Sequence, residues 1–139
     1  MKSTVTTLLI AAMLLLLPPS LCFATEKSFG LINVPTAKVL LADPSAKVAL
    51  FDANGVEYRK KQGTIPGATL LPSSANYPAS VLPSDKTAKL IFYCANKKCM
   101  ASHDAAKRAI SLGYYDVAVL SDGIAGWQEA GEPVESFRE

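Results

Sequence analysis

Short apolar runs alternate with amphipathic or polar segments along most of the chain. The apolar runs predict buried strands at residues 29–33, 48–52, 89–94 and 116–120, with a shorter strand at 68–71. The segments between them predict helices at 37–42 and 56–61, a helix from Ser102 as its N-cap to about 112, and a last short helix from 122 that Gly131 ends. Residues 73–89 contain two prolines and predict a surface connection with at most one helical turn. This alternation predicts an α/β fold with a mostly parallel sheet and helices on both faces.

The first 24 residues follow a different pattern. Lys2 gives a positive start, residues 5–17 form an apolar run, and Pro18-Pro19 interrupt it before small residues at a cleavage position. This arrangement is typical of a secretory signal peptide, and the run is short for a membrane span. We therefore expect an exported, periplasmic protein, with a signal peptide at 1–24, one domain at 25–139 and no membrane association after cleavage.

Composition and charge argue against a nucleic-acid partner. The chain has 139 residues, half of them hydrophobic, and a formal net charge of only +2 with its basic residues scattered. No basic patch of the kind that binds nucleic acid is evident. The sequence leaves the oligomeric state open.

Cys94 is the main candidate for chemistry. It ends the clearest predicted strand, and the loop that follows leads into a helix. In parallel sheets, functional side chains gather beyond the carboxyl ends of the strands, where Asp52 is also expected. The backbone N–H groups at a helix start, together with Lys97 and Lys98, favour the thiolate form of Cys94. Asp52 either accepts hydrogen bonds from loop backbone in a supporting role or ends its strand structurally.

Two other side chains lie close to Cys94 in the sequence. Cys99 completes a C-x₄-C spacing, and it is either a resolving thiol for Cys94 or a residue that fills the loop. A disulfide across so short a loop would contribute little chain-entropy stabilisation, so chemistry explains the pair better than stapling. His103, the only histidine, either assists proton transfer or faces solvent. No second histidine or carboxylate cluster accompanies it, so no metal site is expected.

Five motifs in sequence order resemble those of the rhodanese-like domain family, over roughly residues 29–135. They are Phe51-Asp52-Ala53, Gly63-Thr64-Ile65-Pro66-Gly67-Ala68, the Tyr93-Cys94 strand end with its loop, Leu112-Gly113-Tyr114, and Gly123-Ile124-Ala125-Gly126-Trp127. The resemblance is to the single-domain, exported sulfurtransferase type.

The resemblance implies a mechanism without metal or organic cofactor. The Cys94 thiolate would attack the sulfane sulfur of a small anionic donor such as thiosulfate, releasing sulfite and leaving a persulfide that a thiol or cyanide then discharges. Lys97 and Lys98 would attract the donor. The persulfide would be held by the loop amides of Ala95, Asn96, Lys97, Lys98, Cys99 and Met100.

The loop also departs from the family pattern. Lys97 stands where a glycine is common, and a loop from Cys94 to Ala101 is about two residues longer than usual. Ala53 follows Asp52 where the family commonly has Val-Arg. The loop lacks the terminal arginine with which related phosphatases hold an oxyanion, which argues against phosphatase activity. Two alternatives stay open: a thiol–disulfide redox protein using Cys94 and Cys99, and a non-catalytic binding module.

Overall fold

The computed structural model describes residues 27–138, and the predicted signal peptide lies outside them. The strands form one sheet in the order β1-β5-β4-β2-β3, and every pair of neighbours is parallel. The strands are β1 (Gly30–Ile32), β2 (Val48–Asp52), β3 (Thr69–Leu70), β4 (Lys89–Tyr93) and β5 (Val117–Leu120). The helices are α1 (Val34–Ala42), α2 (Val56–Gln62), α3 (Ala101–Ser111) and α4 (Gly123–Glu129), with the 3₁₀ turn η1 (Ala79–Val81).

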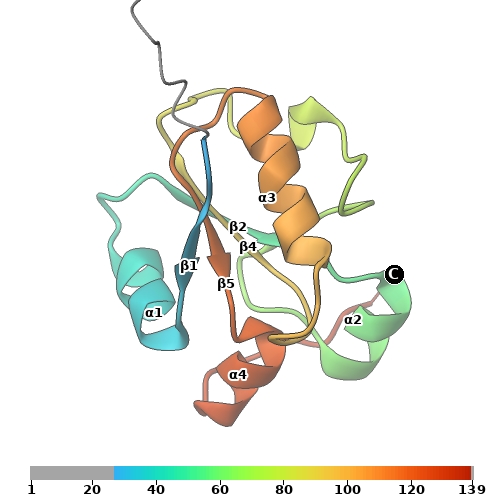
Figure 1. Ribbon diagram of the computed structural model, residues 1–139. Coiled ribbons are helices and arrows are strands. Elements are labelled where there is room, and N and C mark those ends of the chain that lie inside the picture. Colours follow the sequence, from blue (N-terminus) through green and yellow to red (C-terminus); the bar gives the residue numbers. More distant parts are fainter. Residues whose placement is uncertain (1–26, 139) are drawn as a thin grey trace, which may run out of the picture.

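Helices and loops cover both faces of the sheet and bury two apolar clusters (Figure 1). On one face, alanines of α3 pack against Phe92, Val119 and the segment around Tyr77. On the other face, residues of α1 and α4 pack against Leu50, Ile91 and Leu120. The predicted α/β class, with a parallel sheet covered on both faces, is therefore confirmed.

The predicted elements are all present, with ends that differ by a few residues. The β2 strand has the predicted bounds, and the connection 73–89 contains one 3₁₀ turn as expected. The α1 helix begins earlier than predicted because Asn33 caps it, accepting a hydrogen bond from the Thr36 N–H at 3.0 Å. Near the C-terminus, the Trp127 indole donates to the Pro133 carbonyl at 2.9 Å, which supplies the partner that a buried indole requires.

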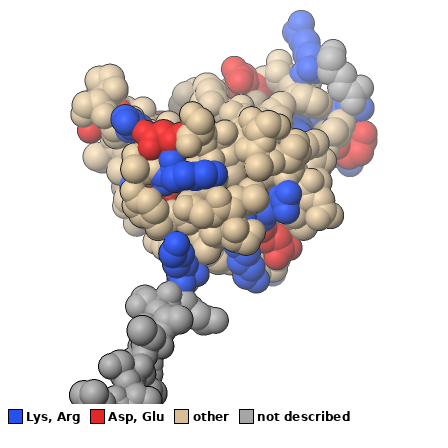
Figure 2. Space-filling view, turned by 90° about the horizontal axis from the view of Figure 1, so that it is seen from above, with Lys and Arg blue, Asp and Glu red and all other residues tan. Residues whose placement is uncertain are grey.

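The face seen from above in Figure 1 carries basic and acidic side chains side by side (Figure 2). This distribution on that face agrees with the scattered charges of the sequence. Within residues 27–138, none of the helices has both the length and the apolar character needed to cross a bilayer.

Candidate functional site

Cys94 lies directly beyond β4, which is flanked by β5 and β2 near the middle of the sheet. The strands end at the lower side of Figure 1, where the loop before α3 and the start of α4 meet. Cys94 is only 1 % exposed and belongs to the apolar cluster under α3. The sulfur is therefore shielded from bulk water on the α3 side of the sheet.

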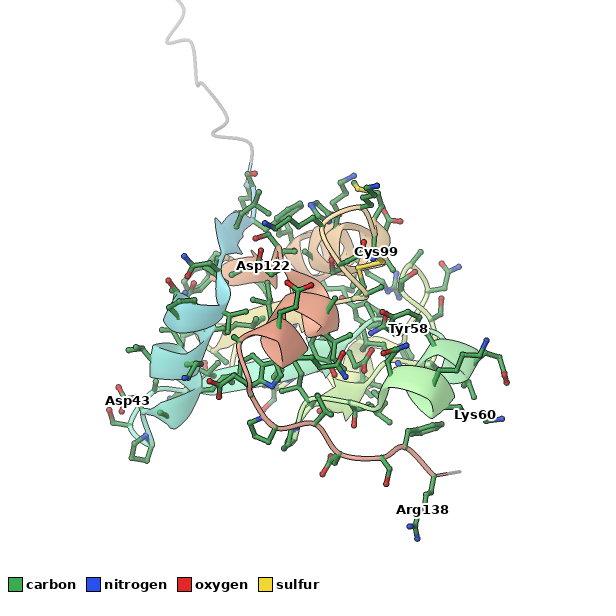
Figure 3. The ribbon with its side chains drawn as sticks, turned by 90° about the horizontal axis from the view of Figure 1, so that it is seen from below. Asp43, Tyr58, Lys60, Cys99, Asp122 and Arg138 are labelled. Atoms are coloured by element: carbon green, nitrogen blue, oxygen red, sulfur yellow. A yellow bond between two sulfur atoms is a disulfide. The ribbon has the colours of Figure 1, made fainter. Side chains whose placement is uncertain are left out.

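Cys94 and Cys99 are joined by a disulfide (Figure 3). Cys99 is less buried than Cys94 and lies at the end of the loop. The loop therefore brings the two sulfurs within bonding contact. The structure shows the oxidised form of the pair.

Ser102 lies against the Cys94 sulfur, with its Oγ 3.2 Å from Sγ. The prediction that Ser102 caps α3 is wrong, because the helix begins at Ala101 and Met100 occupies the cap position. The Asp104 N–H donates to the Met100 carbonyl at 3.0 Å, which closes the first turn earlier than expected. The buried Ser102 side chain points toward the sulfur. Counted in the same way, up to the residue before the cap, the loop runs from Cys94 to Cys99, two residues shorter than predicted, so the prediction of a lengthened loop is wrong.

The start of α4 holds the beginning of the loop that follows β4. The N–H groups of Ile124 and Ala125 donate to the carbonyls of Cys94 and Ala95, at 2.9 and 3.0 Å. Gly123 has a φ of +63°, and a Cβ there would lie 2.6 Å from the backbone of Ala95 and Asn96. Only glycine allows α4 to approach the loop this closely.

Inside the loop, Asn96 organises the backbone. Its side-chain Oδ1 accepts from the Lys98 N–H at 2.9 Å, and its carbonyl accepts from the Cys99 N–H at 3.0 Å. In this oxidised form, the N–H groups of Lys98 and Cys99 therefore donate to Asn96 within the loop. Their predicted role toward a persulfide remains a prediction about the reduced form.

The two loop lysines lie on the outer side of the loop. Lys97 forms an ion pair with Asp122, with Nζ 3.2 Å from Oδ1. Lys97 and Lys98 line a pocket of about 570 Å³ together with Asp122 and Glu129, and neither cysteine is among its lining residues. Asp122 balances part of the positive charge that the sequence assigned to this loop.

Asp52 is fully buried in a polar network at the end of β2. Its carboxylate accepts from the Asn54 N–H and the Tyr93 hydroxyl, both at 2.7 Å, and pairs with Arg59 at 3.5 Å. Arg59 also donates to the carbonyls of Asp52 and Leu71, both at 2.9 Å. Burial, and then the charge of Asp52, raise the pKa of Tyr93, so its phenol stays protonated and donates.

The Asp52 network lies on the opposite side of the sheet from the Cys94 sulfur. Asp52 and Tyr93 are register partners, so their side chains share one face, and the next residue, Cys94, points to the other face. No described hydrogen bond links Asp52 to residues 94–100. Asp52 therefore supports the site only indirectly, by fixing the ends of β2 and β4.

The His103 side chain contacts the segment just before β1. Its ring packs edge-on against Phe29, with ring centroids 5.3 Å apart, and its buried Nδ1 has no hydrogen-bond partner among the described residues. The same described range holds no group of three or more His, Cys, Asp or Glu side chains suited to a metal ion.

The sequence profile of the rhodanese-like domain matches residues 35–130. The chain belongs to the rhodanese-like domain family. A search of curated protein sequences finds no match.

Solved structures of rhodanese-like proteins share this fold. A rhodanese-related protein of Thermoplasma volcanium is 21% identical, with a TM-score of 0.63 over 78% of this chain and 100% of its own. A single-domain sulfurtransferase of Saccharomyces cerevisiae is 22% identical, with a TM-score of 0.61 over 78% of this chain and 99% of its own. A thiosulfate sulfurtransferase of Pseudomonas aeruginosa is 23% identical, with a TM-score of 0.63 over 79% of this chain and 21% of its own.

Sequence reasoning about this rhodanese-like chain missed three contributors to the site. Ser102 was assigned to capping, and the contact of Gly123 with the loop joins segments that are distant in the sequence. Arg59 gave no signal, because it stands among polar residues of α2 and yet is buried. Gly123, three residues after the end of the predicted strand 116–120, was the one available hint of the α4 contact.

Proposed function

We propose that this protein is a sulfurtransferase in which Cys94 carries sulfane sulfur from a small anionic donor such as thiosulfate to a thiol or cyanide acceptor. The observation that carries the proposal is the setting of the Cys94 sulfur: beyond the end of β4, at the start of α3, and 3.2 Å from Ser102 Oγ. Family membership supports it, and two of the structural neighbours are sulfurtransferases by name.

The reaction begins from the reduced pair. The Cys94 thiolate attacks the outer sulfur of thiosulfate, and the sulfur–sulfur bond of the donor breaks, so that sulfite leaves with the electron pair. The positive end of the α3 dipole and a hydrogen bond from the Ser102 hydroxyl stabilise the thiolate and then the persulfide anion. Lys98 and Lys97, at the exposed loop, attract the donor, although Asp122 weakens the contribution of Lys97.

Sulfur loading of Cys94 tests this proposal directly. We expect the reduced Cys99→Ser protein, freed of reductant and treated with thiosulfate, to gain the mass of one sulfur atom and to release one equivalent of sulfite. Cys99 is replaced so that the neighbouring thiol has no part in the result. The matched control is the Cys94→Ser, Cys99→Ser double variant, which should gain nothing. If both proteins stay unmodified, the sulfurtransferase proposal fails, and the non-catalytic binding module and the thiol–disulfide redox protein remain.

The disulfide favours a second candidate, a thiol–disulfide redox protein. Such a protein would exchange electrons with a partner dithiol without ever carrying sulfane sulfur. The same loading experiment separates the two, because a purely redox pair has no reason to leave a stable persulfide on Cys94.

A further inference from the structure

Cys99 forms a covalent bond with the one sulfur that the proposed reaction uses. Two hydrogen bonds to Asn96, from the Lys98 and Cys99 N–H groups, fix the turn between the two cysteines. This turn holds Cys99 Sγ against Cys94 Sγ. A thiol at this position has access to the inner sulfur of any persulfide on Cys94. An external acceptor has less access to Cys94, because this residue is only 1 % exposed.

We propose that Cys99 is the resolving thiol of the reaction, so that the protein converts sulfane sulfur into hydrogen sulfide; this rests on the proposed function. The Cys99 thiolate attacks Sγ of the Cys94 persulfide, and a new bond forms between the two cysteines. The bond from Cys94 to the outer sulfur breaks, and its electron pair leaves with hydrosulfide. The outer sulfur gains two electrons, which the two cysteines lose as they form the disulfide.

The described structure is then the product state of this step. The net reaction of one cycle is thiosulfate plus protein dithiol giving sulfite, sulfide and protein disulfide. Renewed turnover needs an external dithiol, which returns the two electrons to the cysteines and is itself oxidised to a disulfide. This assigns the acceptor class as a dithiol reductant acting through Cys99.

The burial of the two sulfurs fixes the direction of regeneration. Cys99 is only partly buried, whereas Cys94 is closed off beneath α3, so an incoming thiolate reaches Cys99 first. Attack there forms a mixed disulfide on Cys99 and expels Cys94 as thiolate. The Cys94 thiolate that leaves is in contact with Ser102 Oγ, which can stabilise it by a hydrogen bond. A thiolate that is stabilised in this way leaves faster than one that is not. Regeneration therefore restores the nucleophile directly.

A single-turnover experiment tests the role of Cys99. The chain carries three cysteines, so Cys22→Ser makes the loop pair the only thiols. This protein is reduced, separated from reductant and given thiosulfate without oxygen. We expect one equivalent each of sulfite and sulfide, and a protein that has lost two hydrogens. Sulfide should appear with a first-order rate that does not depend on protein concentration, because the step is intramolecular.

Two variants keep the outcome decisive. In the same background, Cys99→Ser and Cys99→Ala should release sulfite, keep the added sulfur on Cys94 and release no sulfide. If the protein with both cysteines also keeps the sulfur and releases no sulfide, the resolving role is overturned while the sulfurtransferase proposal stands. If neither variant of Cys99 takes up sulfur, the proposed function itself fails.

Discussion

The Ser102 hydroxyl lies against the sulfur of Cys94, the proposed nucleophile. Its Oγ lies 3.2 Å from Cys94 Sγ, and both residues are buried. The Cys99 carbonyl oxygen lies at the same distance and accepts only from a protonated thiol. Ser102 is thus the neighbour that can donate to a thiolate, and a hydrogen bond to a charged group is stronger than one between neutral groups.

We expect Ser102→Ala to raise the pKa of Cys94, since the thiolate loses its donor. Hydrogen bonds to charged groups contribute about 1.5–3 kcal/mol, so alkylation of Cys94 near neutral pH should slow about tenfold or more. The measurement is the pH dependence of alkylation in a Cys99→Ser background. Ser111→Ala is the control, because the Ser111 hydroxyl bonds to the Arg108 carbonyl at the far end of the same helix. Equal alkylation rates for the two variants would show that Ser102 does not stabilise the Cys94 thiolate.

Ser102 also shows that a sequence pattern can locate a helix start without identifying the partner of each side chain there. The pattern placed the helix start within two residues, yet the side chain that suggested a cap has another partner. A serine near a helix start is a common cap, and only the packing of α3 on β4 determines whether its oxygen points back along the helix or toward a strand end. The position of Cys94 was predictable because strand end, loop and helix start adjoin in the sequence.

At the scale of elements, the position of the loop depends on α4. Two N–H groups of α4 donate to the Cys94 and Ala95 carbonyls, and Gly123 allows that contact. A side chain at Gly123 would overlap the loop backbone and would also sit at a positive φ. Gly67 also has a positive φ, of +81°, but a Cβ at Gly67 would meet no atom within 4 Å, so this position separates the two effects.

We expect Gly123→Ala to destabilise the protein more than Gly67→Ala. The positive φ costs an alanine about 1–2 kcal/mol at either site, and overlap with the loop adds about 1–3 kcal/mol at Gly123 alone. Denaturant unfolding measures both changes. Gly123→Ala should also slow sulfur loading of Cys94, whereas Gly67→Ala should not. Equal effects on loading would show that α4 does not position the loop.

The order of elements was accessible from the sequence, and the contacts between distant elements were not. Apolar runs bounded by turn residues identify β2 and β4, because strands buried on both faces carry few polar residues. The pairing of Asp52 with Tyr93 and Arg59 depends on the parallel register of these strands and on the path of α2. Such networks carry no sequence spacing of their own, so the buried Arg59 could not be predicted.

For the molecule as a whole, the disulfide is a small part of what holds the fold together. It closes a short loop at one end of the sheet, while two apolar clusters fill the two faces. The chain-entropy contribution of a cross-link falls as the loop that it closes becomes shorter. The proposed cycle requires this arrangement, because the protein must stay folded with its cysteines reduced.

We expect reduction to lower the free energy of unfolding by no more than about 2 kcal/mol, the value that the chain-entropy relation gives for a loop this short. Denaturant unfolding with and without reductant measures this, and far-ultraviolet circular dichroism should not change. Cys99→Ser should match the reduced protein. Loss of cooperative unfolding on reduction would contradict this expectation, and it would make the disulfide a structural staple.

The exposed lysines between the two cysteines have a practical consequence. Lys97 and Lys98 are sites at which trypsin cuts, so digestion separates a peptide holding Cys94 from one that begins at Cys99. In the oxidised protein the disulfide still ties these peptides together, and in the reduced protein they part. A sulfur atom carried by Cys94 adds its mass to the first peptide alone. Mass spectrometry of a tryptic digest therefore reports both the redox state of the cysteine pair and the sulfur carried by Cys94.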